Sequence, residues 1–307
     1  MIGTMTEPQL SADRLFGSNL VAMVAPMNSD GSLSESGMDG LVDHLVATGC
    51  DGLVVNGTTG ESPTLTEAES AQLVGAVAAR STGRAKVIAG IGTYDTKATI
   101  SRARDAEEAG ADALLMVCPY YSRPTQAGVI AHCLAVADAT ALPVMLYDVP
   151  ARTGMEIAAS TLIELAAHPR IVAVKDAKGD LFEAQSVMDR TGLDYYCGID
   201  QLNLPYLAVG ATGLLSVVGN VAADRNAEMI AAVRRGDLDT ARSIQRSLIP
   251  LTSAMMLGAG GAITAKAALT QLGVIPNATV RMPLLDLTPS ELRLLADALT
   301  GVAAIVG

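Results

Sequence analysis

Lysine is the first residue type with a chemical implication, because the chain has only five: Lys86, Lys97, Lys175, Lys178 and Lys266. Lys175 is the one that ends an apolar run, residues 171–174. An ammonium group at a dry strand end loses hydration, which favours the neutral amine. A neutral lysine amine can attack a carbonyl and form a Schiff base. The alternative is a lysine whose side chain extends to solvent and has no chemical role.

Hydroxyl side chains are expected close to this amine. The chain has no Trp and only two Phe, yet Tyr120, Tyr121 and Tyr147 all follow apolar runs of the same kind. Tyrosine hydroxyls can move the protons that imine formation requires. Thr58 and Thr59 lie between glycines, in a turn whose N–H groups could hold a carboxylate. Taken alone, such a turn is more often only a turn.

A guanidinium is expected near the same place. Arg152 follows the run that ends at Tyr147, and its planar fork suits a carboxylate. The alternative for Arg152 is a surface ion pair. The histidines have no spacing typical of a metal site, so no metal is expected; they are His44, His132 and His168. Glycines after two late apolar runs could hold a phosphate, which is the weaker interpretation of Gly198, Gly210, Gly213 and Gly219.

Short apolar runs that alternate with helical patterns must position these residues. Strands are predicted at 20–25, 52–56, 86–90, 113–118, 143–147, 171–175, 195–198 and 213–218. Recurrence about every 30 residues indicates parallel strands joined by helices. Eight such units predict an α/β fold of the (βα)8 or TIM-barrel type, whose strands carry the active site at their C-terminal ends. A doubly wound dinucleotide-binding fold is the rival, but the GxGxxG that it needs after its first strand is missing.

The remainder of the chain is expected to be helical. Helices are predicted at 237–256, at 263–272 and after Thr288, where Thr288 and Glu291 form a start signal. Thr66 with Glu69, and Asp180 with Glu183, indicate two earlier helix starts. The predicted organisation is therefore a leader at 1–16, a barrel at 17–236 and a C-terminal helical extension at 237–307.

Charge and composition limit the partners. The formal net charge is −11, and no basic run is present, so neither nucleic acid nor a membrane surface is expected as a partner. No apolar stretch reaches the roughly 18 residues that a membrane-spanning helix needs. Residues 1–16 have no apolar signal core, and the four cysteines form no CxxC pair. A cytoplasmic location with free, buried thiols is therefore expected.

Four segments carry a family resemblance: 56–62, 119–124, 147–154 and 174–180. They resemble the 4-hydroxy-tetrahydrodipicolinate synthase (dihydrodipicolinate synthase) family, particularly its actinobacterial members, in the superfamily of pyruvate-dependent class I aldolases and lyases. The resemblance extends over nearly the whole chain. It implies condensation of pyruvate with L-aspartate 4-semialdehyde in diaminopimelate and lysine biosynthesis, a homotetramer built as a dimer of dimers, and no cofactor beyond the covalent imine.

The resemblance also implies residue roles. Lys175 forms the imine, and Tyr147 and Thr58 link it to Tyr121, which a neighbouring subunit contributes. Thr59 holds the pyruvate carboxylate, and Arg152 binds the carboxylate of the semialdehyde. The remaining substrate-binding positions are Gly198 and Leu215.

The chain departs from the family pattern in two regions. Ile199 stands where many members have Asp, and Asp148 replaces a frequent Asn, which puts local geometry in question. Lysine-inhibited members carry His, His, Asn and Glu at the positions of Glu67, Ser70, Tyr94 and Ala98. Weak or absent inhibition by lysine is therefore expected.

Two other functions remain in view. A sister aldolase that acts on a sugar acid would share Lys175, but a polyol substrate does not need the cation of Arg152. A non-catalytic barrel that binds a metabolite is a second possibility. It predicts the loss of the lysine or of the hydroxyls, all of which are present.

Overall fold

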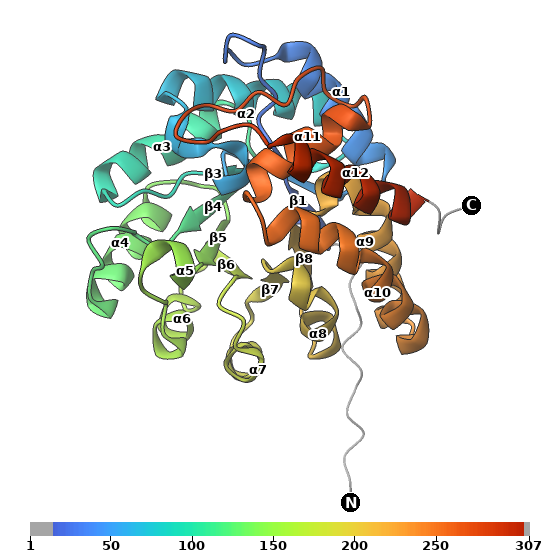
Figure 1. Cartoon of the computed structure of the whole chain (residues 1–307). Helices are drawn as coiled ribbons and strands as arrows, with labels where there is room; N and C mark the ends of the chain where they lie inside the picture. The colour runs from blue at the N-terminus through green and yellow to red at the C-terminus, as the bar shows by residue number, and fades with distance from the viewer. Residues whose placement is uncertain (1–14, 304–307) are drawn as a thin grey trace, which may run out of the picture.

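Eight parallel strands form the centre of the molecule in a computed structural model that describes residues 15–303. The strands pair in chain order, and β8 closes the barrel against β1 (Figure 1). They are β1 (Asn19–Ala22), β2 (Gly52–Val55), β3 (Lys86–Gly90), β4 (Ala113–Val117), β5 (Val144–Asp148), β6 (Ile171–Asp176), β7 (Asp194–Cys197) and β8 (Gly213–Ser216). The predicted TIM barrel is confirmed.

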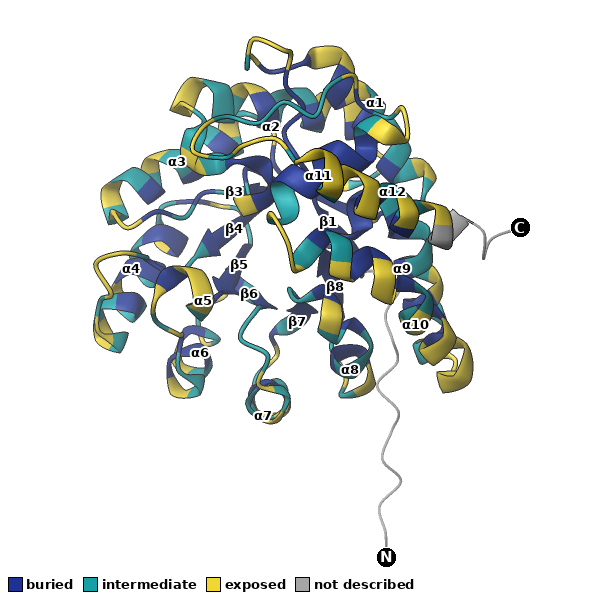
Figure 2. Ribbon diagram, viewed as in Figure 1, coloured by how far each residue is buried: buried dark blue, intermediate teal, exposed yellow. Residues whose placement is uncertain are grey.

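The strands are rich in Val, Leu and Ile because both of their faces are buried (Figure 2). All eight predicted strands are present, and the largest differences lie at the ends of β1 and β8. The prediction extended β8 through Val218. Instead, the N–H groups of Val217 and Val218 donate to the carboxylate of Asp200 at 3.0 and 3.3 Å, which turns the chain out of the sheet.

Helices surround the barrel. The helices of the barrel, in chain order, are α1 (Glu35–Ala47), α2 (Glu67–Ser81), α3 (Thr96–Glu108), α4 (Gln126–Asp138), α5 (Pro150–Thr153), α6 (Ala159–Leu165), α7 (Leu181–Arg190), α8 (Asn203–Ala208) and α9 (Gly219–Arg234). Each strand is followed by one of them, except β5, which is followed by both α5 and α6. Short 3-10 turns, η1 (Thr58–Gly60), η2 (Ser62–Thr64) and η3 (Asp200–Leu202), lie at strand exits.

The predicted helix starts are confirmed by side-chain caps. Thr66 and Glu69 form a complete capping box at the start of α2. The Asp180 carboxylate accepts the N–H of Glu183 at the start of α7. Each cap satisfies N–H groups that have no acceptor within the first turn of a helix.

The C-terminal segment contains α10 (Leu238–Met256), α11 (Gly261–Gln271) and α12 (Pro289–Ala303), close to the predicted ranges. Figure 1 shows the long connection from α11 to α12 passing over α1 and α2. Within residues 15–303, no single helix is long and apolar enough to cross a membrane; α10 and α11 pass that test only together, across a bend of 114°.

The predicted leader lies almost entirely outside the described residues. Phe16, its last residue, is 1% exposed and packs edge-on against Tyr196 at the N-terminal end of the barrel, with ring centroids 6.2 Å apart. The Asp51 carboxylate accepts the N–H groups of Ser18 and Asn19 there, which fixes the chain as it enters β1.

Candidate active site

The Lys175 side chain lies in a cavity at the C-terminal mouth of the barrel. The cavity has a volume of about 420 Å³, and its wall includes Thr58, Thr59, Tyr147, Arg152 and Gly198. These residues come from the exits of β2, β5, β6 and β7. Parallel strands present their C-terminal ends at one edge, which explains why residues far apart in the chain meet here.

Lys175 and Tyr147 are direct neighbours across β5 and β6. Lys175 is only 6% exposed, and its Nζ lies 4.1 Å from the centroid of the Tyr147 ring. The ring face offers a cation a weak electrostatic partner in place of water. The amine therefore faces the cavity from a dry environment, as expected from its position at the strand end.

Gly198 provides the space that the lysine side chain occupies. A Cβ atom at this position would lie 2.9 Å from Lys175 Cε and 3.0 Å from the carbonyl oxygen of Asp176. Real Cβ atoms essentially never show the first distance, and the second is tighter than nine in ten real Cβ contacts. Gly198 therefore contributes by its lack of a side chain, and any other residue would displace Lys175.

The turn that carries Thr58 and Thr59 is a 3-10 turn closed by its own backbone. The N–H of Gly60 donates to Gly57 and that of Glu61 donates to Thr58, at 3.1 and 3.2 Å. The first N–H groups of such a turn have no acceptor within it, so they can bind an anion. Thr59 is buried and Thr58 is exposed, and both line the cavity.

Two predicted residues do not line this cavity. Tyr121 is 91% exposed and has a positive φ of 67°, a strained conformation for an aromatic residue. Leu215 is buried in β8, where it pairs with Leu20 of β1. Leu215 thus lies in the barrel wall, and Tyr121 is exposed to solvent outside the cavity of its own chain.

A second cavity of about 540 Å³ adjoins the first and shares Thr58 and Arg152 with it. Its wall includes Tyr94 and Tyr120, whose rings pack edge-on with centroids 5.4 Å apart. The two cavities therefore meet at Thr58, Val149 and Arg152.

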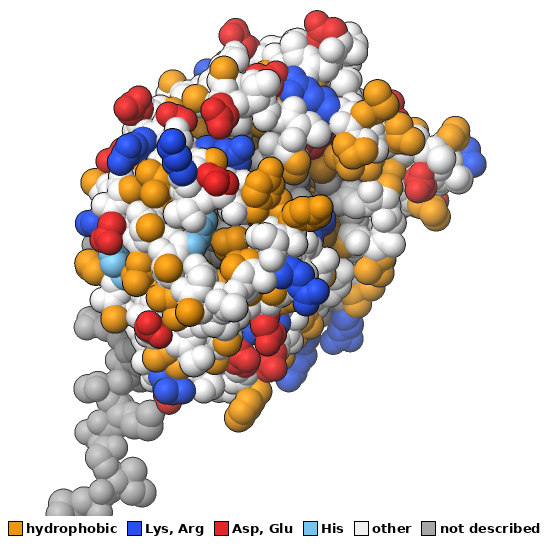
Figure 3. Space-filling model, turned by 90° about the vertical axis from the view of Figure 1, so that its left-hand side faces the viewer, with side chains coloured by type: hydrophobic (Ala, Val, Ile, Leu, Met, Phe, Trp, Pro, Cys, Tyr) orange, Lys and Arg blue, Asp and Glu red, His pale blue; other side chains and the backbone are white. Residues whose placement is uncertain are grey.

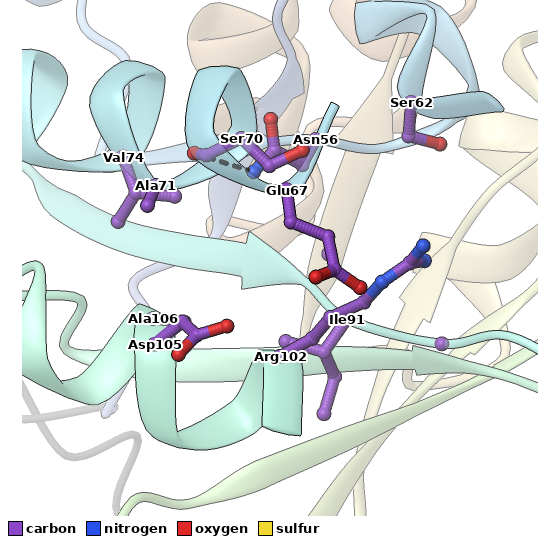
Figure 4. Close-up of a pocket in the computed structure, with 12 residues that line it drawn as sticks. Asn56, Ser62, Glu67, Ser70, Ala71, Val74, Ile91, Arg102, Asp105 and Ala106 are labelled. Carbon is purple, nitrogen blue, oxygen red and sulfur yellow. Dashed lines mark hydrogen bonds between the residues drawn. The ribbon is translucent and has the colours of Figure 1, made fainter. Parts of the chain in front are cut away.

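A smaller cavity of about 30 Å³ lies between α2 and α3 (Figure 4). The amide of Asn56 donates to the carbonyl of Ser70 at 3.0 Å beside it. In Figure 4 the carboxylate of Glu67 points toward the guanidinium of Arg102. Glu67 thus introduces a negative charge at this cavity, and Arg102 lines both this cavity and the neighbouring one of about 540 Å³.

Asp200 orders the loops on the β7 and β8 side of the mouth. It is fully buried, and it accepts hydrogen bonds from Ser216, Val217 and Val218. Burial raises the pKa of its carboxyl, and these donors act in the opposite direction. The bonds join the exit of β7, which carries Ile199, to the exit of β8, and both Ile199 and Val217 line the cavity.

The roof of the cavity was not expected from the sequence. Residues 259–263, at the start of α11, and Met256 cover the mouth from the C-terminal extension. The only local signal is the cluster of Gly258, Gly260 and Gly261, which permits the sharp bend between α10 and α11. Among the described residues, no group of three or more His, Cys, Asp or Glu side chains could hold a metal ion.

The charged side chains on one face of the molecule are of mixed sign. On the face shown in Figure 3, which lies on the left in Figure 1, Lys and Arg side chains are interspersed with Asp and Glu. This face therefore has no basic patch of the kind that binds a polyanion.

Comparisons with known proteins give a consistent result. A sequence model described as the dihydrodipicolinate synthetase family matches residues 15–301. A protein of Streptomyces coelicolor named 4-hydroxy-tetrahydrodipicolinate synthase 1 is 52% identical over 270 residues, which is 88% of each chain.

Solved structures agree with this match. A crystal structure of a dihydrodipicolinate synthase from Bacillus anthracis has a TM-score of 0.90 and 38% identity, and the match covers 93% of this chain and 98% of that one. A dihydrodipicolinate synthase from Acinetobacter baumannii, described as chloride-inhibited and complexed with pyruvate, has a TM-score of 0.90 and 32% identity, covering 94% and 99%.

Proposed function

Because this chain belongs to the dihydrodipicolinate synthetase family, we propose that it condenses pyruvate with L-aspartate 4-semialdehyde to 4-hydroxy-tetrahydrodipicolinate. This reaction is the committed step of diaminopimelate and lysine biosynthesis. The observation that carries the proposal is the amine of Lys175, buried against the Tyr147 ring in a cavity at the mouth of the barrel. The four cysteines are all buried and free, which fits a reducing cytoplasm as the site of the reaction.

Lys175 performs the covalent step. Its neutral amine attacks the keto carbon of pyruvate, and the former carbonyl oxygen leaves as water to give an imine. Loss of a methyl proton converts the imine into an enamine, which forms a carbon–carbon bond with the aldehyde. The amine of the second substrate then displaces Lys175 as the ring closes. The imine itself acts as the electron sink, so the chemistry requires no additional cofactor.

Tyr147 is suited to proton transfer in this sequence, because it is 6% exposed and adjoins Lys175. Thr58 lies on the wall of the same cavity and connects it to the second one. Tyr121 completes the relay from a neighbouring subunit. Its 91% exposure supports this arrangement, since an exposed side chain that does not line its own cavity is available to a neighbouring subunit.

Substrate carboxylates have two places to bind. Thr59 and the N–H groups of its turn lie beside Lys175 and hold the carboxylate of pyruvate. Arg152 also lines the cavity and holds the carboxylate of L-aspartate 4-semialdehyde. Gly198 makes room for the imine, and Leu215 supports the wall behind it.

Reductive trapping tests the proposed function. The protein is incubated with pyruvate and borohydride, and the modified residue is located by mass spectrometry. One reduced pyruvate adduct is expected on Lys175, none in Lys175→Arg, and full modification in the control Lys97→Arg. Parallel rate assays with L-aspartate 4-semialdehyde and with keto-sugar acids identify the second substrate. An unmodified Lys175, or turnover by Lys175→Arg, would contradict the proposal.

The assembly is proposed to be a homotetramer, a dimer of dimers, in which Tyr121 crosses the tight dimer interface. Analytical ultracentrifugation measures the assembly directly. Complementation tests the crossing: Tyr121→Phe and Lys175→Arg are each expected to be nearly inactive alone. Subunit exchange between them should restore about a quarter of wild-type activity, because half of the dimers then contain one intact site. No recovery in verified mixed dimers would mean that Tyr121 does not act across the dimer interface, and a fully active Tyr121→Phe protein would place it outside the relay.

A further inference from the structure

Glu61 and Lys266 form an ion pair in which both side chains are 0% exposed. Glu61 immediately follows η1, the turn that carries Thr58 and Thr59. Lys266 belongs to α11, in the C-terminal extension, and lies 205 residues away along the chain. The pair therefore connects η1, called the catalytic turn below, directly to a segment that is not part of the barrel.

Each side chain of this pair forms one further hydrogen bond. One oxygen of Glu61 accepts from Lys266 Nζ, and the other accepts the N–H of Arg281 at 2.9 Å. Lys266 Nζ also donates to the carbonyl of Thr279 at 2.8 Å. Burying an ion pair costs free energy that apolar residues would not cost, so stability alone is a poor explanation for it.

Glu61 needs an external restraint. Its φ is +56°, in the left-handed region that non-glycine residues rarely adopt because it is sterically strained. The contacts from Lys266 and Arg281 hold Glu61 in this conformation. The conformation in turn sets the direction in which the turn leaves β2 and hence the location of Thr58 and Thr59.

The guanidinium of Arg281 extends this restraint to the far side of the turn. It donates to the carbonyl of Thr64 at 2.7 Å and forms an ion pair with Glu69. It also donates to the carbonyl of Gly31. The extension therefore holds the segment 61–69 at both of its ends.

The same helix contributes to the cavity wall. Its first residues, Gly261, Ala262 and Ile263, line the cavity that contains Lys175. Lys266 lies little more than one helical turn further along. The ion pair thus fixes the separation between the roof of the cavity and the catalytic turn opposite it.

We propose that the buried Glu61–Lys266 pair is a positioning device for the catalytic turn and sets the affinity of the site for the carboxylate of the keto acid. The proposal rests on the proposed function, in which Thr59 and its turn hold that carboxylate. Lys266 and Glu61 do not contact the reacting atoms; they act through Thr58 and Thr59.

The test compares Lys266→Met with the double variant Glu61→Gln, Lys266→Met. The single variant leaves a buried, unpaired carboxylate, so its melting temperature is expected to fall. The double variant removes both charges with side chains of similar volume and is expected to regain most of that loss. Circular dichroism measures the folded fraction, and borohydride trapping at varied pyruvate gives the half-saturation concentration for imine formation.

The decisive readout is the difference between the two substrates. In the folded double variant the pyruvate concentration for half-maximal trapping is expected to rise about tenfold or more, because small displacements of positioning groups have large effects. The KM for L-aspartate 4-semialdehyde, which depends on Arg152, should change less than about threefold. The control Lys86→Met removes a half-exposed pair with Asp112 at the opposite end of the barrel and should change neither constant.

Two outcomes would overturn the inference. One is wild-type pyruvate half-saturation in the folded double variant, and the other is an equal rise in the constants for both substrates. Trapping of the wild-type protein separates this inference from the proposed function. If wild-type Lys175 is not modified, the function fails; if it is modified and the variants match it, only the positioning role fails.

Discussion

Replacing Asp148 by asparagine should stabilise the protein at pH 8 and change its stability little near pH 4. Asp148 ends β5, is 1% exposed, and lies opposite Asp176 of β6. Neither of its carboxylate oxygens has a well-formed hydrogen bond among the described residues, although the backbone of Ile157 acts to lower its pKa. The nearest cation is Lys178 Nζ, 3.6 Å away, which also binds Glu183.

Burial raises the pKa of Asp148 from 3.8 to about 7, and Lys178 offsets this only in part, while Asp176 and Glu156 raise it further. At a pH between 3.8 and about 7, Asp148 keeps its proton in the folded state but has lost it in the unfolded state. The folded state therefore becomes less stable as the pH rises through that window. A shift of about three units corresponds to about 4 kcal/mol above pH 7, as an upper value.

Asparagine cannot ionise, so Asp148→Asn avoids this cost. For a chain of this size, 4 kcal/mol corresponds to roughly 8 °C in melting temperature. Thermal melts of both proteins at pH 4.5, 6 and 8 measure the difference. It should be about 1 kcal/mol at pH 4.5, which already lies above the pKa of an unfolded aspartate, and it should grow with pH.

A matched control is Asp239→Asn, since the side chain of Asp239 is 97% exposed and pairs only with Arg242 on the surface. It should show no gain that depends on pH. The reasoning is refuted if Asp148→Asn is less stable than wild type at pH 8. It is also refuted if the gain is the same at all three pH values, because titration would then not be its cause.

Three further predictions concern activity. Gly198→Ala should lower kcat by about 100-fold or more without unfolding the protein, because its Cβ would displace Lys175. The control is Gly192→Ala, where a Cβ meets nothing within 4 Å. Comparable activity in the two variants would contradict the steric argument. Arg152→Met should raise the KM for L-aspartate 4-semialdehyde about 10- to 100-fold and leave pyruvate trapping unchanged, and a selective loss of trapping would argue against that role. Millimolar lysine should inhibit weakly or not at all in a steady-state rate assay, because Glu67 changes the charge of the small cavity; strong inhibition would disprove this.

The strands of this fold could be predicted because a barrel strand is buried on both faces, so it appears in the sequence as a short, continuous apolar run. Their ends were less predictable. Val217 and Val218 belong to such a run by composition, but hydrogen bonds to Asp200 take them out of β8. Asp200 is distant enough in sequence that no local pattern near β8 reveals this competition.

The site could be predicted in part, because its residues stand at strand ends that a closed barrel must bring together. Lys175, Tyr147 and Arg152 were found in this way. Lys266 was not, since in sequence it is one polar residue in an otherwise unremarkable C-terminal helix. Its burial depends on Glu61, 205 residues away, and a contact of that range leaves no periodicity or spacing to detect.

The lock between Glu61 and Lys266 has a consequence for protein engineering. A shortened chain that stopped before α11 would retain all eight strands and Lys175. It would, however, leave the buried carboxylate of Glu61 without its cation and remove one wall of the cavity that contains Lys175. Such a minimal barrel is expected to fold poorly and to turn over little substrate. Designs that transplant this chemistry should therefore carry the terminal helices along with the strands.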